Sequence, residues 1–206
     1  MSNINEYRQE LKEKIIDYAM KEFYKRGIKA VKMDEISQGL HVSKRTVYEI
    51  FGDKEELLLV GMQMSQEKMR QKIEHFAIHN SHNVIDIFAY FYRLQIERNG
   101  QIEPVFLEDM HKYPRVLKFL NETSDKESEQ RHRFYEAGIK EGLFRSDVDF
   151  AILTKIGHIA MEEIMRQQIY KQYPMQVLFD NYFMVMIRGF CTERGLNLLN
   201  KAISKN

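Results

Sequence analysis

Residues 33–57 read MDEISQGLHVSKRTVYEIFGDKEEL, and the apolar side chains in this stretch are spaced as in two short helices joined by a turn. Ile36 and Leu40 lie four residues apart on the first helix, while Val47 and Ile50 form the inner face of the second. A helix-turn-helix of this kind places its second helix in the major groove of DNA. The stretch therefore predicts a unit that reads double-stranded DNA.

The outer face of the second helix carries side chains that can donate hydrogen bonds to phosphates or base edges. They are Ser43, Lys44, Arg45, Thr46 and Tyr48. Ser43 is the expected N-cap, at a helix N-terminus that also favours a phosphate. Arg45 is the best candidate for reading a guanine, because its guanidinium can bond two acceptors at once. The alternatives are that Lys44 and Arg45 are ordinary solvated charges and that Tyr48 closes the core of the small domain.

A further helix start follows directly. The sequence Asp53-Lys54-Glu55-Glu56 has the form of a capping box, with Asp53 as the N-cap and Glu56 at the third helical position. A lysine in a first turn opposes the helix dipole, and a nearby phosphate would relieve that conflict. Lys54 is therefore predicted to contact a DNA phosphate.

Residues 8 to 57 carry a specific series of side chains beyond the helical pattern. The series is Gly27, Ile36, Val42, Ser43, Lys44, Arg45, Thr46, Val47, Tyr48, Phe51, Lys54, Glu55, Glu56 and Leu57. It resembles the TetR family of bacterial transcriptional regulators. Two positions depart from that family's pattern, since His41 stands where Gly is common and Lys32 where Thr or Ser caps the preceding helix. Histidine tolerates positive φ better than most residues, and Lys32 could replace the lost hydroxyl contact to DNA electrostatically.

Composition limits the rest of the chain. The 206 residues are 44% apolar and include three prolines and no tryptophan, which favours an almost entirely helical globular fold without a sheet. The single cysteine, Cys191, fits a reducing cytoplasm. No apolar run is long enough for a membrane span, and the polar start is unlike a signal peptide. We therefore expect a cytoplasmic protein with no membrane partner.

The net charge of +1 is weak support for a nucleic-acid binder. Residues 1–54 contain eleven Lys or Arg against nine Asp or Glu, so even the predicted DNA-reading part is close to neutral. Placement matters more, because Lys32, Lys44, Arg45 and Lys54 gather around one predicted surface. This pattern predicts modest nonspecific affinity for DNA.

Helical periodicity and stop signals predict nine helices in total, an all-α fold. Three form an N-terminal DNA-binding head in residues 1–56, and six form a C-terminal body in residues 57–206 for effector binding and dimerisation. Besides the two helices of the reading unit, the expected helices span residues 6–26, 53–79, 84–99, 103–113, 114–142, 148–172 and 175–199.

The last two predicted helices carry small and apolar residues that packing within one subunit could explain. The family resemblance implies a four-helix dimer interface here. One small DNA-binding head also contacts only one half-site of an operator. A two-fold dimer with its heads about 34 Å apart would contact two half-sites, which raises the affinity for DNA and fixes the position of each head. The expected interface residues are Gly157, Ala160, Ile164, Tyr182, Val185, Met186 and Gly189.

Aromatic residues are abundant in the body, at spacings that plain core packing also explains. The family resemblance implies an apolar ligand cavity in this part of the chain. The expected lining residues are Phe88, Tyr92, Phe106, Met110, Phe134 and Met161.

No pattern indicates a metal, a cofactor or catalysis. His75, His79 and His82 are spaced so that one helix face could hold a metal, but the break at Asn80-Ser81 separates the last histidine, and surface histidines explain the pattern. No catalytic triad order, phosphate loop or zinc-protease motif is present, so we expect neither an enzyme nor a cofactor.

The main hypothesis is a dimeric transcriptional repressor that a small apolar effector releases from a palindromic DNA operator through the helix that starts at Asp53. The alternative is a DNA-anchored interaction protein, such as a nucleoid-associated or cell-division partner, without an effector cavity. Burial of Phe88, Tyr92 and Phe106 around a cavity of several hundred cubic ångströms would favour the first.

Overall fold

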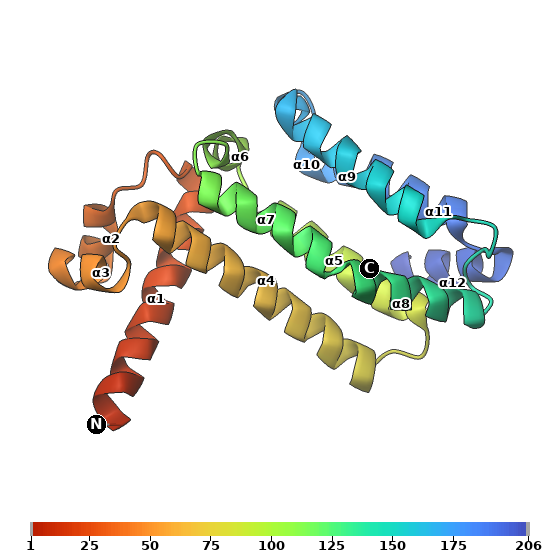
Figure 1. Ribbon diagram of the computed structural model, residues 1–206, viewed down its shortest axis with the longest axis horizontal. Coiled ribbons are helices and arrows are strands. Elements are labelled where there is room, and N and C mark those ends of the chain that lie inside the picture. Colours follow the sequence, from red (N-terminus) through yellow and green to blue (C-terminus); the bar gives the residue numbers. More distant parts are fainter. Residues whose placement is uncertain (1, 205–206) are drawn as a thin grey trace. The chain divides into compact units, whose positions relative to one another are not determined.

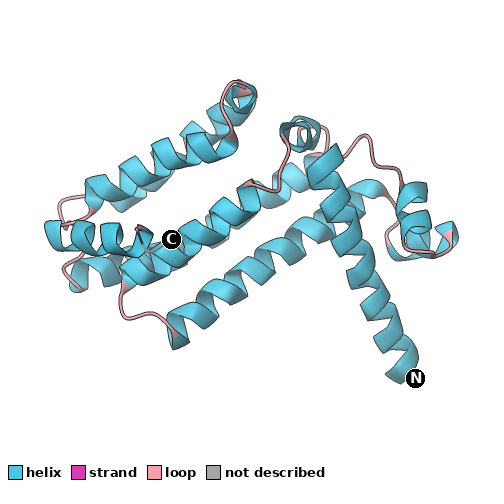
Figure 2. Ribbon diagram, turned by 180° about the vertical axis from the view of Figure 1, so that it is seen from behind, coloured by secondary structure: helices cyan, strands magenta, loops and turns pink. Residues whose placement is uncertain are grey.

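The computed structural model describes residues 2–204, and the regular structure in that range is helical (Figure 2). The chain divides into two compact units, each made of two segments. The first unit comprises Met1–Lys68 and Gln101–Glu122, and the second comprises Met69–Gly100 and Thr123–Asn206. The units therefore do not follow the predicted division at residue 56, because a segment from the middle of the chain packs with the N-terminal helices.

The first unit contains the helix-turn-helix (Figure 1). Its elements are α1 (Ser2–Arg26), α2 (Met33–Gly39), α3 (Lys44–Ile50), the first part of α4 (Lys54–His79), α6 (Pro104–Met110) and the first part of α7 (Pro114–Lys126). The predicted inner stripe of α1 is buried at Ile15, Ala19 and Phe23. Gly27, with φ of 82°, ends α1 as expected from the conformational freedom of glycine.

The helix-turn-helix forms for the predicted reasons. Ile36 and Val47 are fully buried, so the inner faces of α2 and α3 meet in a small core. His41 takes the positive φ, 55°, that the turn requires. Gly39 lets α2 approach α1 closely, because a Cβ at this position would overlap the side chain of Tyr18.

The second unit consists of the remaining helices. They are the ends of α4 and α7, α5 (Val84–Asn99), α8 (Ser128–Lys140), α9 (Phe150–Arg166), a 3₁₀ turn (Ile169–Lys171), α10 (Met175–Phe179), a π-helical turn (Asp180–Met184), α11 (Val185–Phe190) and α12 (Glu193–Ile203). Their core is rich in aromatic rings, with Phe144, Phe150 and Phe190 packed edge to face or tilted against one another.

Three predicted helices are interrupted in the structure. The helix expected over residues 114–142 divides into α7 and α8 at Glu127, and the one over 148–172 ends at Arg166, before Gln168 takes a left-handed φ of 55°. The one over 175–199 breaks at Cys191, whose backbone pairs with Phe144, and α12 then starts with Thr192 as its N-cap. The prediction of uninterrupted helices was wrong here. At Cys191 the break coincides with backbone hydrogen bonds to a distant segment, Leu143 to Arg145.

Candidate nucleic-acid interface and ligand cavity

The outer face of α3 is exposed, as its sequence predicts. The side chain of Arg45 is 87% exposed, and Lys44 and Tyr48 are exposed beside it. The Tyr48 ring does not close a core, and the Lys44 ammonium lies 5.8 Å from its centre. Ser43 caps α3 by accepting a hydrogen bond of 3.0 Å from the backbone N–H of Thr46. Together with Thr46, these residues form one ridge at the helix N-terminus, which we call the reading ridge (residues 43–46 and 48).

Both cations of the reading ridge form ion pairs with carboxylates of the protein. The Lys44 ammonium donates to Asp34 at 2.8 Å, and the Arg45 guanidinium donates to Glu49 at 2.7 Å. Each pairing raises the pKa of the cation through a side-chain hydrogen bond. Because the pairs are exposed, each is weak and open to exchange for a DNA phosphate or base. The spacing of four between Arg45 and Glu49 was visible in the sequence, whereas the partnership with Asp34 depends on the fold.

Lys32 is exposed at the N-cap of α2, where its side chain makes no capping hydrogen bond. The position therefore lacks a hydroxyl cap, as the sequence indicated, and leaves an ammonium on the surface of the unit that carries the reading ridge.

Lys54 has a different role from the predicted one. Asp53 caps α4 by accepting from the N–H of Glu56 at 2.7 Å, as the capping box predicts. The Lys54 ammonium, however, donates to the carbonyl oxygens of Ile28 at 2.8 Å and Val31 at 2.9 Å, with a longer contact of 3.4 Å to that of Lys29. Burial lowers its pKa. These hydrogen bonds use the three protons of the ammonium, so Lys54 holds the loop between α1 and α2 instead of offering a free charge to a phosphate.

The corner between α6 and α7 holds the same loop and the start of α4. The buried carboxylate of Asp109 accepts from the backbone N–H of Lys29 at 2.7 Å. Arg115, at the start of α7, donates its backbone N–H to Glu55 at 2.9 Å and pairs its guanidinium with Glu56. Polar contacts from α6 and α7 therefore hold the segments that precede α2 and follow α3 within the same compact unit as the reading ridge.

The second unit contains a cavity of about 380 Å³ lined mainly by aromatic and aliphatic side chains, which we call the aromatic cavity. Its lining residues are Ile73, Ile87, Phe88, Phe91, Glu127, Gln130, Arg131, Phe134, Tyr135, Phe183, Met186, Ile187 and Phe190. Phe88 stacks on Phe183 with ring centres 5.3 Å apart. The polar lining residues come from one place, the start of α8, where Arg131 lies 3.6 Å from Glu127.

The structure brings only two of the six predicted effector residues, Phe88 and Phe134, to this cavity. Phe106 and Met110 are buried in the first unit, where Phe106 packs edge to face on Tyr24 of α1. Their assignment to one cavity with Phe88 was wrong, because α6 packs on α1. Met161, on α9, is not among the lining residues.

Tyr92 also lies outside the lining of the aromatic cavity. Its hydroxyl donates to Asp180 at 2.6 Å, so this tyrosine joins α5 to the π-helical turn. Burial and this hydrogen bond raise the pKa of Tyr92 to about 12.

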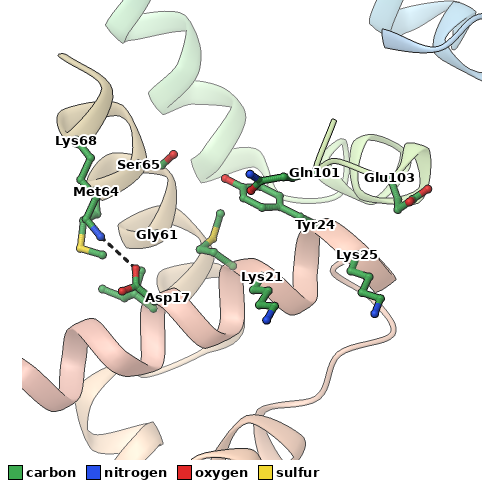
Figure 3. Close-up of a pocket in the computed structure, with 12 residues that line it drawn as sticks. Asp17, Lys21, Tyr24, Lys25, Gly61, Met64, Ser65, Lys68, Gln101 and Glu103 are labelled. Atoms are coloured by element: carbon green, nitrogen blue, oxygen red, sulfur yellow. Dashed lines mark hydrogen bonds and ion pairs between the residues drawn. The ribbon is translucent and has the colours of Figure 1, made fainter. Parts of the chain in front are cut away.

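A second, more polar pocket of about 600 Å³ lies in the first unit where α1 crosses α4 (Figure 3). Gly61 permits the crossing, because a Cβ there would lie 2.7 Å from Cγ of Met20. The ion pair of Lys68 with Asp17, at 3.1 Å, closes one side, and Tyr24 extends into the pocket (Figure 3). Its lining is charged and includes one aromatic ring, so it fits a small apolar molecule less well than the aromatic cavity does.

The predicted dimer residues lie on α9 and on the segment from the π-helical turn to α11. Val185 and Gly189 are exposed, and Ala160, Ile164 and Met186 are half-buried. Gly157 and Tyr182 touch each other within the subunit, since a Cβ on the glycine would lie 3.0 Å from the tyrosine hydroxyl. Sequence reasoning missed an exposed apolar row on α9, whose spacing of four and three would have identified it. The row is Ile152, Ile156 and Ile159.

Comparisons with known proteins agree with this architecture. The family model for "Bacterial regulatory proteins, tetR family" matches residues 15–60. No curated protein matches the chain in sequence. Among solved structures, a γ-butyrolactone receptor described as ArpA-like superposes with a TM-score of 0.65 at 15% identity, over 97% of this chain and 100% of that one.

Two further solved structures share the fold. A proposed transcriptional regulator from Saccharomonospora viridis, in complex with choline, gives a TM-score of 0.62 at 16% identity, over 84% of this chain and 97% of that one. The fatty acid degradation regulator FadR from Bacillus halodurans gives 0.59 at 16% identity, over 85% and 94%. In the described part of this chain, no helix is long and apolar enough to cross a membrane.

Proposed function

Because the chain belongs to the TetR family of bacterial regulatory proteins, we propose that it is a dimeric repressor whose reading ridge binds a palindromic operator and whose aromatic cavity takes an effector that releases the DNA. The observation that carries the proposal is the exposed ridge of Lys44, Arg45 and Tyr48 at the N-terminus of α3. Its shape and charge suit the major groove.

Within the ridge we assign different tasks to the two cations. Arg45 is exposed and forked, so it is the candidate for a guanine edge, while Ser43, Lys44, Thr46 and Tyr48 contact phosphates. Lys32 adds a phosphate contact from the start of α2. Lys54 supports them indirectly, since it fixes the loop that precedes α2.

The effector part of the proposal rests on the aromatic cavity. Phe88 is buried and lines a cavity of about 380 Å³, within the size range of small-molecule sites. The related folds include a receptor for γ-butyrolactone and a protein solved with choline, which supports ligand binding by this architecture. The alternative of a DNA-anchored interaction protein has no need of such a cavity.

Release requires that effector and operator weaken each other's binding by the same factor, and the coupling in such systems is typically about 1–3 kcal/mol. The chain passes between the two units within α4, between α5 and α6, and within α7. Two of these segments lead to Asp109 and Arg115, which contact the loop after α1 and the first turn of α4. We propose that effector binding acts on the reading ridge through these contacts.

The test is binding of purified protein to DNA from its own promoter and to random DNA at several salt concentrations. We expect a salt-sensitive preference for the promoter. Arg45→Ala should reduce discrimination at one base position by about 1–3 kcal/mol, whereas Lys44→Ala should weaken all sequences alike. Equal losses on matched and mismatched sites for both variants would contradict the division of roles, and absence of any promoter preference would refute the proposed function.

Glu49→Gln is a matched control that changes the same surface but should have the opposite effect on DNA affinity. It removes the carboxylate that holds the Arg45 guanidinium at 2.7 Å, so the arginine is free to meet DNA and binding should become stronger. A loss of affinity in this variant would indicate that Glu49 orients Arg45 for the groove.

A further inference from the structure

Arg131 and Tyr135 on α8 form a wall shared by two pockets of the second unit. On one side is the aromatic cavity, and on the other is a pocket of about 480 Å³ between α8 and α9. We call the latter the cationic pocket. Its lining residues are Ser128, Arg131, His132, Tyr135, Phe150, Ala151, Thr154, Lys155 and His158.

The polar groups that line the cationic pocket are all hydrogen-bond donors. Among the described residues that line it are a guanidinium, an ammonium, two imidazoles and three hydroxyl groups, but no carboxylate. All of these polar groups can donate hydrogen bonds to an anion. Tyr135 stacks on Phe150 with ring centres 4.2 Å apart, which gives the pocket an apolar base.

Three of these groups have a carboxylate beside them that does not line the cationic pocket. His132 and His158 lie 3.3 Å and 3.2 Å from Glu136 and Glu162, each one turn along its own helix. Arg131 is 3.6 Å from Glu127, which lines the aromatic cavity and not the cationic pocket. These are long or exposed pairs that an incoming anion can replace. No described carboxylate pairs with Lys155, so its ammonium is available to a ligand.

The two pockets thus present an apolar chamber and a cationic chamber on either side of one arginine. We propose that the effector is an amphiphilic anion, with its apolar body in the aromatic cavity and a phosphate or carboxylate group held by Arg131 and Lys155 at the cationic pocket. This inference rests on the proposed effector function and specifies the chemical class of the effector.

Calorimetry on the full chain without DNA tests the inference with four probes, each below its micelle concentration where it forms micelles. They are decyl phosphate, decanol, decyltrimethylammonium and inorganic phosphate. We expect decyl phosphate to bind about tenfold or more tightly than decanol, because charge-assisted hydrogen bonds add to the same apolar contact. The ammonium probe should bind more weakly than decanol, and inorganic phosphate should bind least. Equal affinity for the three decyl compounds would overturn the inference, as would phosphate binding as tightly as decyl phosphate.

Variants locate the head group. Lys155→Gln and Arg131→Gln should each reduce the affinity for decyl phosphate about 3- to 10-fold and leave decanol binding unchanged. Arg133→Gln is the matched control for Arg131, since Arg133 lies on the same helix, pairs with Glu129 at 2.5 Å and lines neither pocket. Lys155 is exposed, so its variant will fold even if the Arg131 variant does not. Unchanged decyl phosphate binding by Lys155→Gln would overturn the assignment.

The same probes added to the protein–promoter complex separate this inference from the proposed function. Decyl phosphate that binds through Lys155 but leaves the DNA bound would uphold the anion site and contradict effector control. Equal release of DNA by decanol and decyl phosphate, with equal affinities, would uphold effector control and contradict the anion site.

Discussion

At the residue scale, Lys54 and Asp109 both bind the backbone of the loop between α1 and α2. The ammonium of Lys54 reaches the carbonyl oxygens of Ile28 and Val31, and the carboxylate of Asp109 reaches the N–H of Lys29. A lysine and an aspartate from distant parts of the sequence thus satisfy polar groups of a loop that has no helix to satisfy them. Both side chains contribute to the position of α2 without facing the reading ridge.

Lys54→Met should therefore change stability and affinity in a way that a phosphate contact would not. Removal of the ammonium leaves buried carbonyl groups without donors, and we expect a loss of about 1–3 kcal/mol in the free energy of unfolding. DNA binding should weaken, but the slope of log affinity against log salt should stay unchanged, because no phosphate contact is lost. Lys44→Met is the control and should lower that slope by about one. A similar decrease of the salt slope in the Lys54 variant would instead support a direct contact between Lys54 and a DNA phosphate.

Asp109 predicts a specific dependence of stability on pH. Burial tends to raise the pKa of this carboxyl group, but the N–H of Lys29 and the ammonium of Lys112 lower it below its ordinary value. A pKa that is depressed in the folded state stabilises the protein above the unfolded pKa of about 3.9, and this stabilisation disappears as pH falls through the folded pKa. Asp109→Asn should therefore cost about 1–2 kcal/mol at pH 7.

Denaturant unfolding at pH 7 and near pH 3 checks the pH prediction. The difference between the wild-type chain and Asp109→Asn should shrink toward the acidic end, since the carboxyl group of the folded chain takes up a proton as pH falls through its lowered pKa. Asp147→Asn is the control, because Asp147 also has a lowered pKa through Arg145 but lies on the surface. An equal effect of the two variants would show that burial against the loop does not matter.

At the element scale, the helix-turn-helix depends on a close contact between α1 and α2. Gly39→Ala would place a methyl group onto the side chain of Tyr18, and we expect a loss of about 1–3 kcal/mol together with weaker DNA binding. Tyr18→Leu in the same chain should recover part of the loss by removing the ring. Thermal unfolding of the two single variants and the double variant measures the coupling. Additive losses would show that the two residues do not meet.

Helices that begin and end on local signals could be predicted from the sequence. Ser43, Asp53 and Gly27 act through their own backbone neighbours, so the end of α1 and the starts of α3 and α4 follow from short stretches. The break at Cys191 is different in kind. There the N–H of Arg145 donates to the carbonyl of Phe190 and that of Thr192 to the carbonyl of Leu143, so a segment some fifty residues away ends the helix. No local pattern contains that information.

The same distinction applies to the candidate sites. The reading ridge was predictable because one helix carries all of its residues, and burial of Val47 fixes which face is outside. The lining of the aromatic cavity depends on how α5, α8 and α11 meet, so sequence reasoning found Phe88 and Phe134 but missed Phe91 and Phe183. The partners of Lys54 were missed for the same reason, because they precede it by more than twenty residues.

At the scale of the whole molecule, one reading ridge contacts one half-site, so the proposed operator binding needs two chains. The second unit offers a suitable surface, since Ile156 on α9 is 53% exposed and Val185 on α11 is 66% exposed. Exposed aliphatic side chains on neighbouring helices indicate a surface that a partner covers. We expect the partner to be a second copy of this chain.

Ile156→Asp tests that expectation. A carboxylate within an apolar dimer interface would be buried without a partner, so the variant should sediment as a monomer at concentrations where the wild-type chain is a dimer. Its affinity for the full operator should fall to that for a single half-site, because the two ridges no longer bind together. Ile78→Asp is the matched control, since Ile78 is 75% exposed at the end of α4, outside the predicted interface. A dimeric Ile156→Asp protein would contradict the prediction that α9 lies in the dimer interface. Equal dissociation of the Ile156→Asp and Ile78→Asp dimers would contradict it as well.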